Sequence, residues 1–116
     1  MDFLRENNID VDSSIEILGD IEMVNETMDD FLLEMEDRIP LMIEHKENND
    51  MENYAIIVHA IKGDSKYLGF TKLADLALNH QLKAQDSDVK FVNDNFDELM
   101  VEINRVIDVI NEYKVM

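Results

Sequence analysis

Apolar residues recur at every third or fourth position along four long segments of this chain, which is the spacing of one face of an α-helix. Only three glycines and one proline are distributed over its 116 residues, so little in the chain interrupts a helix. With 46% hydrophobic residues, the chain also has enough apolar side chains to form a buried core. These features predict an all-α fold and argue against intrinsic disorder.

Capping residues predict where the helices of the N-terminal half begin and end. We expect a short helix that is capped by Asp12 and ended by Gly19, followed by a long helix capped by Asp20. Pro40 lies inside the apolar stripe of this long helix and removes one backbone hydrogen bond. Because the stripe continues through Met42, we expect a bend there rather than the end of the helix.

Three further helices are expected in the C-terminal half. After a polar loop, one helix begins at Met51 and ends near Gly69; Thr71 caps the next, and a turn at 86–88 precedes the last. Short connections favour antiparallel neighbours. The sequence therefore predicts an antiparallel, up-down-up-down four-helix bundle with a short extra N-terminal helix, forming a single domain over residues 1–116.

Composition excludes several classes of function. With 27 acidic and 10 basic residues, the formal net charge is -17, which repels both nucleic acid and anionic membrane surfaces. The absence of cysteine excludes disulfides and thiolate chemistry and fits a reducing compartment. No apolar run reaches about 18 residues, and the acidic N-terminus does not resemble a signal peptide. We expect a cytoplasmic protein with no nucleic acid or membrane partner.

Motifs for metal or nucleotide binding are missing from the sequence. The glycines do not cluster into a phosphate-binding loop, none of the three histidines follows a glutamate at the spacing of a di-iron bundle, and no calcium-binding loop is present. We therefore expect neither a metal site nor a cofactor.

His59 lies in a segment that is more basic than the rest of this acidic chain. It follows the core-facing Val58 by one residue, and this step of roughly 100° turns it toward solvent. Lys62 and Gly63 follow three and four residues later, so they share its face of the helix. From His59 to Lys83 the chain holds four basic and two acidic side chains, which is a mildly basic island in an acidic protein. A lone histidine is more often structural than functional, so the residues alone leave both interpretations open.

The segment VHAIKGDSKYLGF, at residues 58–70, resembles the signature of histidine-containing phosphotransfer domains. The resemblance implies that His59 is phosphorylated, that Lys62 offsets the phosphoryl charge and that Gln81 hydrogen-bonds the second imidazole nitrogen. It further implies a partner-docking surface formed by Gly63, Ser65, Lys66 and Gly69. Asp64 departs from the pattern, because this position is usually small and uncharged. A second departure is His80, which we interpret as a core or boundary residue rather than a second phosphorylated histidine.

The function that this resemblance implies is a phosphorelay step in two-component signalling. His59 would exchange a phosphoryl group with an aspartate in the receiver domain of a response regulator or hybrid histidine kinase. The protein would have no ATP-dependent kinase activity of its own, would act as a monomer, and would rely on Mg²⁺ held by the receiver.

Two alternatives remain open at this point. One is a non-transferring acidic helical adaptor that binds a receiver or kinase domain, for which Asp64 is the supporting feature. The other is an unrelated acidic adaptor in which His59 has no special role.

Overall fold

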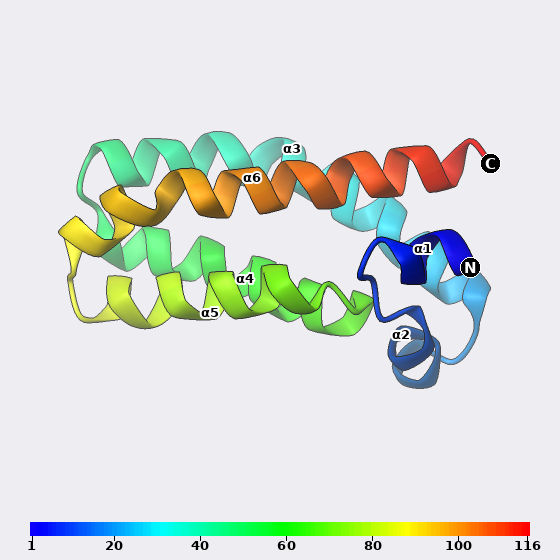
Figure 1. Ribbon diagram of the computed structural model, residues 1–116. Helices are drawn as coiled ribbons and strands as arrows, with labels where there is room; N and C mark the ends of the chain where they lie inside the picture. Colours follow the sequence, from blue (N-terminus) through cyan, green and yellow to red (C-terminus); the bar gives the residue numbers. More distant parts are fainter.

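The computed structural model describes residues 1–116 as six helices connected by short turns (Figure 1). Successive long helices run in opposite directions, which confirms the predicted up-down-up-down bundle (Figure 1). Two short helices lie at the end of the bundle where both termini are found (Figure 1). No helix combines the length and the apolarity that crossing a membrane requires. The helices are α1 (Asp2–Glu6), α2 (Val11–Leu18), α3 (Ile21–Glu47), α4 (Met51–Leu68), α5 (Thr71–Gln85) and α6 (Val89–Lys114).

Aspartate side chains cap four of these helices. Each accepts a hydrogen bond from the backbone N–H three residues later, which satisfies one of the free donors of the first turn. The predicted cap at the start of α3 and the polar loop before α4 are thereby confirmed. The four caps are Asp10, Asp20, Asp50 and Asp88.

The expected caps of α2 and α5 were wrong. Asp10 caps α2, whereas Asp12 binds Arg5 through both carboxylate oxygens, at 2.8 and 2.6 Å. At the start of α5 the capping position is held by Phe70, whose ring is buried in the core, and Thr71 is the first helical residue. Packing of the aromatic ring therefore decides this boundary in place of a side-chain cap.

The sequence did not predict α1, but it correctly predicted that α3 does not end at Pro40; the bend expected there stays a prediction. α1 has only five residues, which is too short to display a helical period, and its buried Leu4 attaches it to the core. α3 continues without interruption past Pro40 to Glu47, as the continuing apolar stripe indicated.

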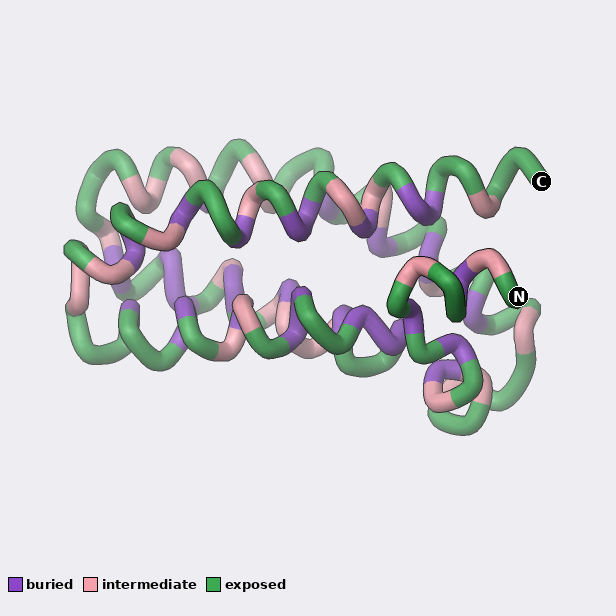
Figure 2. Tube along the Cα trace, in the orientation of Figure 1, coloured by how far each residue is buried: buried purple, intermediate pink, exposed green.

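One apolar core runs along the middle of the bundle. The inward faces of all four long helices are buried, while their outward faces are exposed (Figure 2). α4 and α5 form the most extensive helix pair, and three small alanine side chains on α5 are buried. This pair carries the candidate site. The alanines are Ala74, Ala77 and Ala84.

Candidate functional site

His59 stands exposed on α4 between two buried core residues, Val58 and Ile61. Its Nδ1 lies 3.1 Å from Oε1 of Gln81, which α5 holds on the facing side of the helix pair. Gln81 is buried, with 9% of its surface exposed. The firmly packed glutamine therefore fixes the orientation of an otherwise solvent-accessible imidazole.

This hydrogen bond also selects the tautomer of His59. An amide oxygen only accepts hydrogen bonds, so Nδ1 must carry the proton and donate it to Gln81. In the neutral ring the lone pair then resides on Nε2, which has no hydrogen-bond partner within the chain. The arrangement leaves Nε2 as an available nucleophile.

Two lysines share the face of α4 that carries His59. Lys62 is partly exposed and Lys66 is exposed, and neither forms an ion pair. Their helix pair is electrically different from the rest of the bundle. α4 and α5 together carry three acidic and four basic side chains, whereas α3 and α6 carry fifteen acidic and five basic ones. In this strongly acidic protein, the surface around His59 is therefore the most favourable one for an anion.

A shallow groove lies beside His59 between α4 and α5. Its volume is about 580 Å³, and it is open to solvent. Ile56, with 60% of its surface exposed, contributes an apolar side chain to the groove one turn before His59. A protein surface can therefore make apolar contacts next to the imidazole. The other lining residues are Glu52, Ala55, Gln81, Ala84, Gln85 and Ser87.

Gly63 leaves unfilled space one turn after His59. A Cβ atom at this position would meet no other atom within 4 Å. A glycine inside a helix is less favourable than alanine by about 1 kcal/mol, and here no internal contact requires it. The space beside Gly63 is therefore not filled by other residues of the chain.

The sequence matches the Hpt domain family over residues 26–109, which is most of the chain. The chain belongs to the Hpt domain family. No curated protein and no solved structure matches it. Membership implies histidine phosphotransfer in two-component signalling, and Hpt domains generally interact with receiver domains and kinases.

Two residues that were expected to dock a partner are internal in this Hpt domain. Ser65 is fully buried, and its hydroxyl donates to the carbonyl oxygen of Ile61 at 2.7 Å. Gly69 ends α4 with a φ of +77°, and a Cβ there would collide with the backbone of Asp10. Both residues support the fold, and their burial corrects the docking role expected for them. Gly63 and Lys66 remain accessible.

His80 is a core residue, as the sequence predicted. The residue is 1% exposed, with Nε2 3.2 Å from the carbonyl oxygen of Asn95 and Nδ1 2.8 Å from the hydroxyl of Tyr54. Because a carbonyl only accepts, Nε2 carries the proton and Tyr54 donates to Nδ1. Burial lowers the pKa of His80, since the charged ring would lose its hydration. Both nitrogens are occupied, so this ring is not available as a nucleophile.

The buried His80 should make stability depend on pH. Its folded pKa is lower than that of the unfolded chain, so the unfolded state takes up a proton first as the pH falls. The neutral His80 ring therefore gives its full contribution to the free energy of unfolding above about pH 6.5. Below this pH the contribution is lost, at up to about 1.4 kcal/mol per pH unit. Urea unfolding between pH 7.5 and 5.5 measures this loss. The slope should be smaller in His80→Gln, and an equal slope in both proteins would contradict the prediction.

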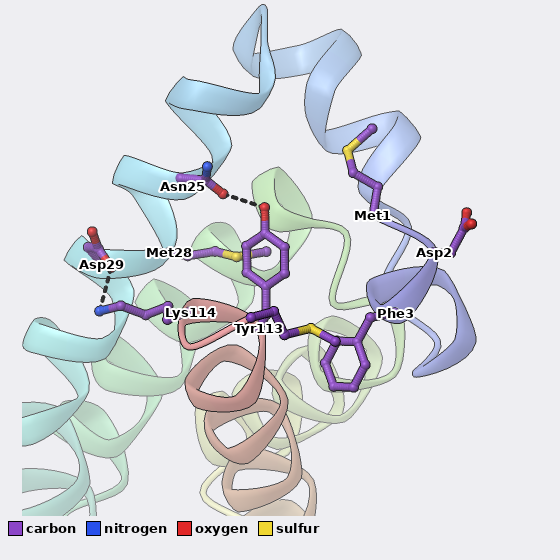
Figure 3. A pocket seen from close by; sticks show the side chains of 9 residues that line it. Met1, Asp2, Phe3, Asn25, Met28, Asp29, Tyr113 and Lys114 are labelled. Carbon is purple, nitrogen blue, oxygen red and sulfur yellow. Dashed lines mark hydrogen bonds and ion pairs between the residues drawn. The ribbon is translucent and has the colours of Figure 1, made fainter.

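The largest hollow of the molecule is remote from His59. It has a volume of about 640 Å³ and lies where α1, α3 and α6 meet, at the end of the bundle (Figure 3). Its polar side chains are already engaged: the Tyr113 hydroxyl donates to Asn25 at 2.7 Å, and Lys114 pairs with Asp29 at 2.7 Å (Figure 3). No group of three or more metal-ligating side chains is present here or elsewhere. The hollow offers no arrangement of reactive groups.

Proposed function

We propose that this Hpt domain relays a phosphoryl group between His59 and an aspartate of a receiver domain. The observation that carries the proposal is the exposed imidazole of His59, whose Nδ1 is held by the buried Gln81. That contact leaves Nε2 with a free lone pair on the surface. The family supports phosphotransfer as the chemistry, and the geometry supports His59 as the residue that performs it.

The transfer step follows from the tautomer of His59. Nε2 attacks the phosphorus of an aspartyl phosphate on the receiver and forms a P–N bond. The P–O bond to the aspartyl carboxylate breaks, and the carboxylate leaves with that electron pair. Nδ1 keeps its proton, and its hydrogen bond to the Gln81 oxygen stabilises the positive charge that the ring acquires. The reverse reaction delivers the phosphoryl group to a receiver aspartate.

The surroundings of His59 favour this reaction through charge and position. Phosphoryl transfer depends mainly on alignment and on stabilising the oxygens of the transferring group. Lys62 and Lys66 supply positive charge on the same face of α4, and Ile56 supplies apolar surface for docking. We further propose that the chain does not phosphorylate itself from ATP, since it has no glycine-rich loop to hold the nucleotide.

Mixing this protein with a receiver domain that carries a ³²P-labelled aspartyl phosphate tests the proposal. The expected result is label on this chain that is lost in acid and stable in alkali, as for a phosphorus–nitrogen bond. The adaptor alternative predicts a complex with the receiver that leaves the chain unlabelled. Binding without labelling, in the presence of Mg²⁺, would overturn the proposed relay.

Replacing Gly63 with alanine should separate stability from function. The substitution should raise the free energy of unfolding by about 0.5 to 1 kcal/mol, because alanine favours a helix and its Cβ meets no atom. Transfer from a receiver domain should become slower, because the methyl group occupies the approach to His59. Labelling by phosphoramidate, a small donor, should be unchanged. Equal transfer rates from the receiver would show that Gly63 does not provide room for docking.

A further inference from the structure

Asp64 is the most unusual residue near His59, and the structure shows where its charge lies. It follows Gly63 on α4, and its carboxylate is turned toward α3, where it accepts a hydrogen bond from Nη1 of Arg38. Nη2 of the same guanidinium lies 2.9 Å from Oε2 of Glu34, one turn earlier on α3. Arg38 thus lies between two carboxylates, and its side chain is 20% exposed.

The position of Asp64 on the helix defines how it can influence His59. Five residues of α-helix separate the two, which corresponds to roughly 140° of rotation and about 7.5 Å of rise. A carboxylate at this distance acts on a phosphoryl anion through its field rather than through contact. Two unit charges about 10 Å apart still repel measurably near a protein surface, and more strongly at low ionic strength.

The carboxyl groups of Glu34 and Asp64 lie close together, and the positive charge of Arg38 stabilises both of them. Partial burial raises the pKa of Glu34, and the neighbouring Asp64 carboxyl raises it further, while Arg38 opposes both effects. Without the guanidinium, two carboxylates would face each other with no cation between them. Lys62 and Lys66 cannot take its place, because they lie on the face of α4 that carries His59.

We propose that Arg38 is a positioning residue for phosphotransfer, which holds the Asp64 carboxylate against α3 and offsets part of its charge. The phosphoryl group on His59 then meets the field of Lys62 and Lys66 with weaker opposition from Asp64. This inference rests on the proposed function of His59 and adds a role for a residue of another helix. It also explains how this chain accommodates an acidic residue directly after Gly63.

The test compares phosphorylation of His59 in Arg38→Gln with the wild type, using both phosphoramidate and a phosphorylated receiver as donors. We expect labelling to be slower by about threefold at low ionic strength, because the charge of Asp64 is no longer offset. The difference should become smaller in about 0.5 M salt, where such fields are screened. Circular dichroism at both salt concentrations should show the helical content of the wild type, because a structural defect from repulsion between Glu34 and Asp64 would also be weakened by salt.

A second variant identifies Asp64 as the source of the effect. In Arg38→Gln combined with Asp64→Asn, labelling should return to the wild-type rate, since the net charge of the cluster of Glu34, residue 38 and residue 64 is again −1, as in the wild type. Arg5→Gln is the matched control, because Arg5 also binds two aspartates, Asp2 and Asp12, but lies on α1 at the end of the bundle. Its labelling rate should be unchanged.

The outcomes separate this inference from the proposed function. Unchanged labelling in Arg38→Gln, or a double variant that remains slow, would overturn the role of Arg38 while leaving the relay intact. If phosphoramidate labels the wild type and the receiver does not, the relay fails. The phosphoramidate comparison among the variants then still decides the role of Arg38.

Discussion

Replacing His59 with glutamine is expected to abolish phosphoryl labelling of this Hpt domain and to leave its fold intact. Glutamine has no nucleophilic ring nitrogen, so no P–N bond can form at this position. Because the side chain of His59 is exposed and makes one hydrogen bond, its loss should change the free energy of unfolding by less than about 1 kcal/mol. Label counting and circular dichroism on the same samples measure the two effects.

His45 provides the matched control for this experiment. It is a partly buried histidine near the end of α3, with Nδ1 3.8 Å from a carboxylate oxygen of Asp50. His45→Gln should be labelled at the rate of the wild type. Label that persists in His59→Gln and disappears in His45→Gln would show that His45, on α3, is the phosphorylated residue. Unfolding of His59→Gln would show that the imidazole has a structural role instead.

Arg105→Met is expected to produce the largest loss of stability among the variants considered. Arg105 donates to both carboxylate oxygens of Glu102, at 2.7 and 2.9 Å, and the side chain of Glu102 is only 3% exposed. Removing the cation leaves a buried carboxylate without a partner, which costs about 3 kcal/mol. Arg105 also donates to the carbonyl oxygen of Asn7, so the connection between α6 and the turn after α1 is lost as well. Urea denaturation measures the change.

Two further variants show whether burial of the charge is the cause. Lys90→Met removes an exposed ion pair with Asp94 and should change stability by less than about 1 kcal/mol. Combining Arg105→Met with Glu102→Leu removes both charges and should recover much of the lost stability. If the double variant is as unstable as Arg105→Met, the contact with Asn7 carries the effect rather than the unpaired carboxylate.

The sequence predicted which face of a helix each side chain lies on, because the spacing between residues fixes their directions around the helix axis. The offset of His59 from Val58 predicted an exposed imidazole, and the spacing to Lys62 predicted a lysine on the same face. The contact with Gln81 was predicted only by the family resemblance. Gln81 lies on a different helix, so residue spacing within one helix could not place it opposite His59. The hydrogen bond from His59 Nδ1 to Gln81 Oε1, at 3.1 Å, exists because α4 and α5 pack side by side.

Several contacts were decided by packing between helices that are distant in the sequence. Ser65 and Gly69 looked like surface residues of a motif, but α2 and the core cover them. Arg38 lies 26 residues before Asp64, and nothing in the sequence indicated that their side chains meet. Asp10 rather than Asp12 caps α2, and Asp12 instead pairs with Arg5 of a different helix.

The sequence by itself determined the helical bundle, the exposed histidine and the lysine beside it. These features depend on the period of a single helix, which each segment carries in its own residues. The contact of Gln81 with His59 was implied by the family resemblance, but only the tertiary structure decided which other distant groups meet: Arg38 with Asp64, and Arg105 with the carbonyl oxygen of Asn7. Such pairs depend on the rotation and register of one helix against another, which follow from how the whole core packs.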